Sequence, residues 1–194
     1  MAADRYPDLL TILVNLSTQI APIIMMMQGV CALIGIYLIA GALVEIWGVT
    51  YDNAMKYVPS NQKFSIPSAL MQLVVGAIFS MMSTLEWVGI MSRTITGDFV
   101  NSRYLSHAPA DSSYAAQVAV ATGAIMGVLQ IVGFVAMCKG WMSVNRIFNG
   151  QSNNSLGMAL WWVVGGILAW NFSWFAQVIN NSTGFNFIQL FPAS

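Results

Sequence analysis

Side chains that could do acid–base, nucleophilic or metal chemistry are few in this chain and far apart in the sequence. Seven Lys or Arg and seven Asp or Glu residues account for 7% of the 194 positions, and the single histidine is His107, in a polar segment. A histidine in such a segment is usually solvated, and no group of Cys and His residues has the spacing of metal ligands. Glu45 and Glu86 approach the long apolar runs only at their ends. We therefore expect no enzyme activity, no cofactor and no metal site.

Polar groups inside the apolar runs are also scarce, and the clearest are Gln130 and Asn171. Ionisable or strongly polar residues within a membrane span are the usual sign of ion or proton transfer, and a coupled transporter generally has more of them. Their scarcity favours a structural or conduit subunit over a pump.

The overall composition indicates a protein that faces lipid. The chain is 57% hydrophobic with a mean hydropathy of +0.68, whereas soluble domains carry roughly 25% charged residues. Equal numbers of acidic and basic residues argue against a nucleic-acid partner, because nucleic-acid binders are usually clearly basic. We expect an all-α membrane protein in contact with the lipid bilayer.

Runs without charge predict four membrane-spanning helices. The first run covers residues 9–44, which is 36 positions, and one span needs about 20. We place the first span at 22–44, with Pro22 at its start, and interpret residues 1–21 as a separate amphipathic helix that lies on the membrane or on a neighbouring subunit. The alternative is that this segment forms the early part of the first span. The other spans are expected at 64–85, 115–138 and 156–179.

These spans form a single membrane domain of two tandem helical hairpins. Its expected segments are the N-terminal amphipathic helix at 1–21, the first hairpin at 22–92, a polar connection at 93–114, the second hairpin at 115–179 and a tail at 180–194.

Two weak echoes in the sequence suggest that the hairpins are copies of one unit. Residues 29–35 (GVCALIG) resemble residues 127–133 (GVLQIVG), and residues 74–78 (VVGAI) resemble residues 163–167 (VVGGI). Apolar segments also share letters by chance, so duplication and coincidence both remain open. A true duplication predicts that the two halves have the same orientation in the membrane.

The same alignment separates the two cysteines. It matches Cys31 with Leu129, nine residues before Cys138, and this corresponds to a difference in depth of roughly 13 Å at 1.5 Å per helical residue. We therefore expect two small buried hydrophobic side chains and no internal disulfide.

Glycines along the spans are candidates for close helix contact, because small residues let helices in lipid approach each other. The contact could be within the chain or between subunits, and the sequence leaves both open. The candidate interface residues are Gly29, Gly35, Gly123, Gly127, Gly165 and Gly166.

Basic residues near the ends of the spans set the expected orientation. The first and third loops hold four of them, and the remaining polar segments hold three, Arg5, Arg93 and Arg103. This majority favours cytoplasmic first and third loops and periplasmic termini. The loop residues either only fix the orientation or line the cytoplasmic mouth of an oligomeric conduit. They are Lys56, Lys63, Lys139 and Arg146.

Several features together resemble the IcmC/DotE family of small inner-membrane proteins of Dot/Icm-type (type IVB) secretion systems. They are a slightly acidic start that we expect to remain uncleaved, four spans, the Met-rich run at 23–27 and the stretch WWVVGG at 161–166. The resemblance implies a bacterial inner-membrane subunit of a machine that exports effector proteins, with DotA-like and IcmD/DotP-like partners. It carries no residue with assigned chemistry.

A weaker resemblance concerns each half alone. Each half is similar to the two-helix pilins of type IV secretion and conjugation systems, which are hairpins with a short basic cytoplasmic loop and both ends outside. This chain departs from that pattern because its two hairpins are fused through the long polar connection.

Three functions follow as hypotheses. The first is a non-enzymatic, self-associating subunit that contributes to the assembly or the wall of a secretion conduit, which the composition and the family resemblance favour. The second is a small membrane channel or transporter that acts alone, and the third is the membrane anchor of an enzyme complex.

Overall fold

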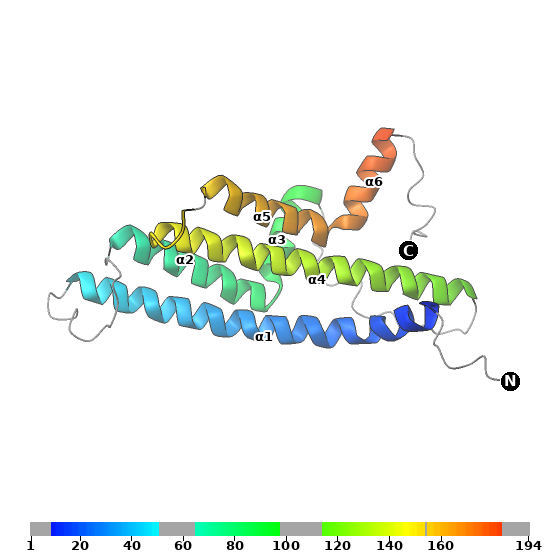
Figure 1. Cartoon of the computed structure of the whole chain (residues 1–194), viewed down its shortest axis with the longest axis horizontal. Helices are drawn as coiled ribbons and strands as arrows, with labels where there is room; N and C mark the ends of the chain where they lie inside the picture. The colour runs from blue at the N-terminus through cyan, green and yellow to red at the C-terminus, as the bar shows by residue number, and fades with distance from the viewer. Residues whose placement is uncertain (1–8, 51–64, 98–113, 154, 184–194) are drawn as a thin grey trace.

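The computed structural model describes residues 9–50, 65–97, 114–153 and 155–183, and these residues are helical apart from short turns (Figure 1). Two of the six helices are much longer than the others, at 42 and 35 residues. In chain order the helices are α1 (Leu9–Thr50), α2 (Ile66–Ser83), α3 (Glu86–Thr96), α4 (Tyr114–Phe148), α5 (Leu156–Trp170) and α6 (Phe172–Thr183).

The helices form two antiparallel pairs that lie side by side. Helix α2 runs back along α1, and α5 runs back along α4, while the two long helices α1 and α4 point in the same direction (Figure 1). Helix α4 is the central element, because it packs against α1, α2, α5 and α6. The parallel direction of α1 and α4 is the arrangement that a duplicated hairpin requires.

Three of the described helices are long and apolar enough to cross a membrane. They cover Asn15–Thr50, Ile66–Ser83 and Gly123–Phe148, and α5 with α6 would add a fourth if this pair, bent by 82°, counts as one broken span. The chain therefore has the make-up of an all-α, multi-pass membrane protein.

The separate amphipathic helix expected at 1–21 is not present as such, because α1 continues through Pro22 without a break. Proline removes one backbone N–H donor from a helix, and long membrane helices tolerate this loss. Ile20 and Ile24, on either side of Pro22, are both buried in the same core, so the packing holds one helix across the proline. The alternative interpretation, an early part of the first spanning helix, is the one observed from Leu9 onward.

Two of the other predicted boundaries are also wrong. Helix α4 does not end near Lys139 but continues to Phe148. The expected fourth span at 156–179 breaks at Asn171, where α5 ends and α6 turns away. The predicted second span agrees with α2, which then breaks at Thr84 and Leu85 before α3 begins.

Local sequence explains where these helices start and stop. Ser65 and Ser155 accept hydrogen bonds from the backbone N–H groups of Ser68 and Met158, so each serine caps the first turn of its helix. Gly97 ends α3 with a positive φ of 80°, which glycine adopts without strain. Leu85 has a φ of 60° and is the only described non-glycine residue with a positive value.

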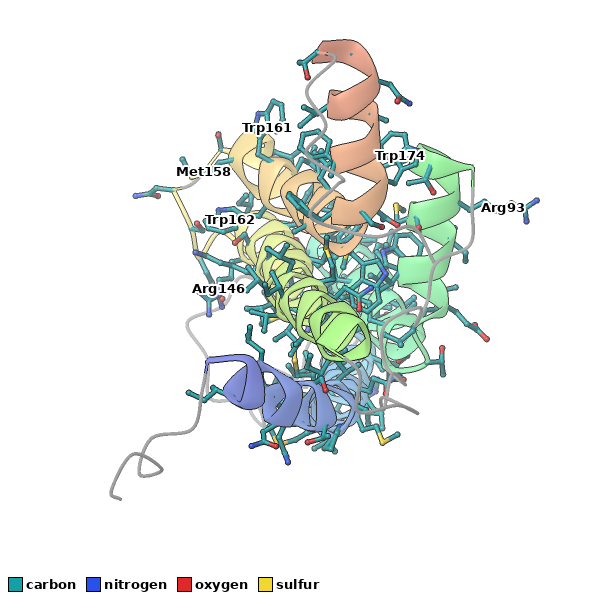
Figure 2. All side chains as sticks on the ribbon, turned by 90° about the vertical axis from the view of Figure 1, so that its right-hand side faces the viewer. Arg93, Arg146, Met158, Trp161, Trp162 and Trp174 are labelled. Atoms are coloured by element: carbon teal, nitrogen blue, oxygen red, sulfur yellow. The ribbon has the colours of Figure 1, made fainter. Side chains whose placement is uncertain are left out.

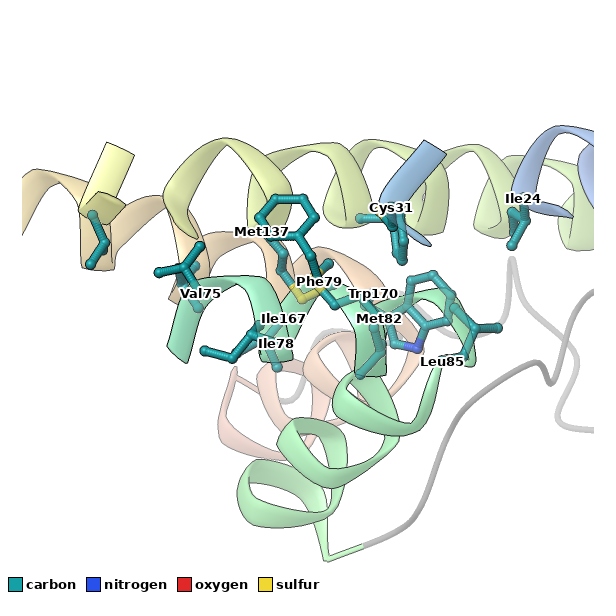
Figure 3. Close-up of a cluster of buried hydrophobic side chains, with 14 of the residues drawn as sticks. Ile24, Cys31, Val75, Ile78, Phe79, Met82, Leu85, Met137, Ile167 and Trp170 are labelled. Carbon is teal, nitrogen blue, oxygen red and sulfur yellow. The ribbon is translucent and has the colours of Figure 1, made fainter. Parts of the chain in front are cut away.

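One apolar core joins the two helix pairs (Figure 3). Phe79 and Met82 of α2 are fully buried, as is Met137 of α4. Trp170 at the end of α5 is 2% exposed and packs on Phe134 with ring centroids 6.2 Å apart.

Candidate functional site

The first helix pair crosses at two glycines. A methyl group placed on Gly35 would lie 2.7 Å from the hydroxyl oxygen of Ser80 and 3.0 Å from the carbonyl oxygen of Gly76. A methyl group on Gly76 would lie 2.8 Å from a side-chain carbon of Ile39 and 3.2 Å from the carbonyl oxygen of Gly35. The backbones of α1 and α2 therefore approach each other more closely than a larger residue at either position would allow.

The second helix pair crosses at two glycines in the same way. A methyl group on Gly133 would lie 2.6 Å from the carbonyl oxygen of Gly166 and 2.7 Å from the backbone nitrogen of Trp170. A methyl group on Gly166 would lie 2.6 Å from the carbonyl oxygen of Gly133 and 2.8 Å from the backbone nitrogen of Met137. Close backbone approach at small residues is the usual way in which helices pack in lipid.

The two crossings lie at equivalent positions of the two helix pairs. Gly35 and Ile39 of α1 correspond to residues 133 and 137 of α4, which lie 98 positions further along. Gly76 and Ser80 of α2 correspond to residues 166 and 170 of α5, which lie 90 positions further along. The sequence echo matched Gly76 with Gly165, one residue too early. A shift of one residue turns a helical position by about 100°, which is why Gly166 faces the crossing and Gly165 does not.

The six glycines predicted as interface residues therefore divide into two groups. Gly35 and Gly166 form the crossings, and Gly127 lies against the side chain of Ile20 on α1. At the other three, no atom outside the glycine's own helical surroundings lies within 4 Å of where a side chain would begin. They are Gly29, Gly123 and Gly165.

Four glycines that carry close contacts were not among the predicted sites, and Gly41, which lies against a side chain of α2, is the first of them. Gly76 and Gly133 lie in the repeated segments but were not proposed as contacts. Pairing the two repeated segments within each hairpin would have identified them as the crossing residues. Gly140 packs against Val163, with a methyl position 2.9 Å from the backbone nitrogen of that residue, and no signal in the sequence singled it out.

The two cysteines meet, contrary to the prediction. The sulfur atoms of Cys31 and Cys138 lie 3.6 Å apart between α1 and α4, and both thiols are free. The prediction assumed that residues equivalent in the repeat lie at equal depth. Contacting residues of the parallel helices α1 and α4 are instead 107 positions apart, nine more than the 98 of the repeat, and this stagger brings Cys138 beside Cys31.

Two of the four predicted loop cations are not in a loop. Lys139 and Arg146 both lie on α4 and are exposed. The ammonium nitrogen of Lys139 lies 3.7 Å above the ring of Trp162, and Figure 2 places Trp162 and Arg146 on the same side of the molecule. Lys56 and Lys63 lie outside the described residues.

The same side of the molecule holds an open cavity of about 500 Å³ at the start of α5. Exposed apolar and aromatic side chains make up most of its lining, and Trp161 is 75% exposed. Tryptophan with a neighbouring cation is typical of the membrane–water interface. The lining residues are Ser155, Gly157, Met158, Trp161 and Trp162.

Polar side chains join the helices at the end of the bundle where α1 and α4 finish and α2 begins. A carboxylate oxygen of Glu45 accepts a hydrogen bond from the backbone N–H of Ser65 at 3.2 Å, which ties the end of α1 to the start of α2. The hydroxyl of Ser68 donates to the side-chain oxygen of Asn149 at 2.6 Å, which ties α2 to the end of α4. The described ends of α1 and α4 therefore lie on one side of the bundle.

A buried polar contact lies at the break between α5 and α6. The hydroxyl of Ser92 on α3 donates to the side-chain oxygen of Asn171 at 2.5 Å, and the side-chain nitrogen of Asn171 donates to the carbonyl of Ile167 at 3.0 Å. Ser92 is fully buried and Asn171 is 3% exposed. Gln130, the other interior polar residue named from the sequence, is 1% exposed and its amide has no hydrogen-bond partner among the described residues.

The described residues contain no group of three or more His, Cys, Asp or Glu side chains that could hold a metal ion. His107 lies outside the described residues. Comparison of the chain with protein-family models, with curated proteins and with solved structures gives no match.

Proposed function

We propose that this protein is a non-catalytic subunit of an inner-membrane assembly, and that the assembly is a type IVB protein secretion apparatus. In this proposal α1, α2, α4 and the broken pair α5–α6 make four crossings as two tandem hairpins, with both termini on the periplasmic side. The resemblance to the IcmC/DotE family supports the choice of assembly, and the parallel direction of α1 and α4 supports two hairpins with one orientation. The proposed partners are further copies of this chain and DotA-like and IcmD/DotP-like subunits.

The observation that carries the proposal is the pair of glycines that open outward. Gly29 has nothing within 4 Å of a side-chain position, and it lies on a face of α1 where Met25 is 69% and Leu33 is 70% exposed. Gly165 is equally open on α5. Glycine weakens a helix relative to alanine, and a glycine on an outer face leaves room for the backbone of a second helix to approach. We therefore propose that these two faces contact neighbouring subunits.

The test is the double substitution Gly29→Leu with Gly165→Leu in the full chain, expressed with the other components of the apparatus. Both positions are open and leucine favours a helix over glycine, so the purified variant should have a thermal midpoint no lower than that of the unchanged protein. Its co-purification with the partner subunits and its support of effector export should fall at least tenfold. The matched control is Met25→Leu, which keeps the bulk of an exposed apolar residue on the same face.

Unchanged co-purification and export in the double variant would contradict the proposal, because both faces would then be covered by lipid alone. Recovery of a soluble enzyme with the unchanged protein would instead favour a membrane anchor of an enzyme complex.

A second candidate function, a small channel or transporter that acts alone, is favoured by one observation. The break at Asn171, beside buried Ser92, is the kind of interrupted helix that lines solute sites in transporters. Flux of a defined solute through liposomes that contain only this protein, reduced in the variant Asn171→Leu, would support it over the subunit proposal.

A further inference from the structure

The cysteine pair joins the two halves of the molecule at one point. Cys31 belongs to α1 in the first helix pair and Cys138 to α4 in the second, and their sulfur atoms lie 3.6 Å apart. A disulfide bond has a sulfur–sulfur distance of about 2.05 Å, so the atoms would have to approach by about 1.6 Å. Rotation of two side chains can supply a movement of this size.

The packing around the pair supports closure without movement of the helices. One row of contacts runs along the seam between α1 and α4, because Ile20 meets Gly127 with the same separation of 107 positions as the two cysteines. The helices are thus in one register from three turns before the cysteines up to the pair itself. No sliding of α1 along α4 is needed to form the bond.

The two thiols differ in their accessibility. Cys31 is 2% exposed, whereas Cys138 is half-buried. Cys138 lies about one helical turn after Val135, which is 51% exposed on the outer side of α4. An oxidant dissolved in the surrounding lipid would therefore meet Cys138 first, with Cys31 directly behind it.

We propose that Cys31 and Cys138 form an oxidisable dithiol, which an apolar hydroperoxide converts into an intramolecular disulfide between α1 and α4. The sulfur of Cys138 attacks one oxygen of the hydroperoxide, the oxygen–oxygen bond breaks, and the alcohol leaves with the thiol proton. The sulfenic acid formed on Cys138 is then attacked by the sulfur of Cys31, and water leaves. Two thiols lose two electrons and the hydroperoxide gains them. This inference stands independently of the proposed function.

The chemical class of the oxidant follows from the surroundings. Both thiols lie within the apolar core or at its edge, and they lie on helices that are long and apolar enough to cross a membrane. Lipid hydroperoxides and small organic hydroperoxides dissolve in this environment, and hydrogen peroxide dissolves in it poorly.

The experiment treats the purified full-length protein in detergent with cumene hydroperoxide. We expect the intact mass to fall by about 2 Da, the loss of two hydrogen atoms, and the peptides that contain Cys31 and Cys138 to be joined in a monomeric chain. The thermal midpoint should rise by about 5 °C or more, because the bond closes a long loop, and a reductant should reverse both changes. An equal concentration of hydrogen peroxide should act more slowly.

Two single variants test the order of events. In Cys31→Ser the hydroperoxide should leave a sulfenic acid on Cys138 that dimedone traps, and in Cys138→Ser dimedone should trap none. Both variants should fold, since serine adds no bulk, and Cys31→Ser should have the lower thermal midpoint because it places a hydroxyl in the apolar core. A sulfenic acid on Cys31 in the second variant would overturn the assignment of Cys138 as the first thiol to react.

Copper–phenanthroline, which oxidises adjacent thiols without selectivity, separates geometry from reactivity. If it forms no intramolecular link, the two thiols do not meet and the proposal fails. If it forms the link and cumene hydroperoxide leaves two free thiols, the pair is only a packing contact and the proposal also fails. Faster reaction with hydrogen peroxide than with cumene hydroperoxide would overturn the lipid origin of the oxidant.

Discussion

The two helix crossings use the same glycine arrangement at different closeness. In the first, the methyl position on Gly35 meets the hydroxyl oxygen of Ser80 at 2.7 Å and the backbone nitrogen of Ser80 at 2.9 Å, and the methyl position on Gly76 meets a side-chain carbon of Ile39 at 2.8 Å. In the second, backbone atoms of Gly166 and Trp170 stand 2.6 and 2.7 Å from the methyl position on Gly133. Backbone atoms cannot rotate away as a side-chain end can, and they stand closer at the second crossing, so the second crossing has less freedom to accept a larger residue.

The difference follows from where each pair lies in the bundle. Helix α4 packs against four other helices. In its most apolar 18-residue segment 44% is buried, compared with 22% in that of α1. At equivalent places, the second half has the buried Trp170 where the first has the smaller Ser80. One repeated motif therefore supports a central helix pair in one half and a peripheral pair in the other.

The breaks that follow the crossings also differ. In the first half, Leu85 takes a left-handed conformation with a φ of 60° and its side chain is 6% exposed, so burial holds the turn. In the second half, Asn171 holds the turn by hydrogen bonds to Ser92 and Ile167. An apolar turn can be loosened only by loss of packing, whereas a polar turn can be loosened by loss of one hydrogen-bond partner.

The largest expected effect is at the second crossing. Gly133→Ala should destabilise the protein by about 3 kcal/mol or more, and Gly35→Ala by about 1–3 kcal/mol, because overpacking against fixed backbone leaves no room for adjustment. Thermal or denaturant unfolding of the protein in detergent measures both. Gly29→Ala and Gly165→Ala are the matched controls and should not lower stability, since alanine favours a helix over glycine by up to about 1 kcal/mol and both positions are open. Equal losses at the two crossings would remove the difference between the halves.

An intermediate effect is expected at the polar break. Asn171→Ala removes both hydrogen bonds of the buried amide, to Ser92 and to Ile167, and should cost about 1–3 kcal/mol. Hydrogen exchange of the α6 amides should become faster, while that of the α3 amides changes less. Thr94→Ala is the control, because this exposed hydroxyl bonds only the carbonyl of Ile90 in its own helix. Unchanged exchange in α6 would mean that packing, as at Leu85, also holds this turn.

The smallest effect is expected for the exposed cation beside the second helix pair. The contact of Lys139 with Trp162 should contribute about 0.5–1 kcal/mol. A double-mutant cycle of Lys139→Met and Trp162→Leu measures it as the difference between the double variant and the sum of the single variants. Strictly additive losses would show that the cation and the ring do not interact, and this contact would then not contribute to the stability of the second helix pair.

Composition and charge spacing predicted much of the architecture. Runs without charge located the helices of both pairs, because a long apolar segment is stable only where it avoids water. The glycine echoes predicted that the halves run in one direction, and the parallel helices α1 and α4 agree with this. Gln130 and Asn171 were identified from the sequence as interior polar groups, and both are buried.

Boundaries and partners within the bundle were less predictable. Nothing in the letters around Pro22 distinguishes a helix join from a tolerated proline, and the buried Ile20 and Ile24 decide it through contacts with distant residues. Lys139 was expected to end a helix because charge is unfavourable in lipid, but the ring of Trp162 accepts it on the helix surface. The break at Asn171 depends on Ser92, 79 positions away.

The sequence by itself determined that the chain has helices long and apolar enough to cross a membrane, that these helices come in two similar pairs, and that small residues recur where helices can approach. These properties depend on local composition and period. Only the tertiary structure decided which glycines form the crossings and which open outward, since a rotation of one residue separates Gly165 from Gly166. It also decided the stagger of α1 against α4, and with it the meeting of Cys31 and Cys138, because the register between two helices is set by side-chain packing along the whole seam.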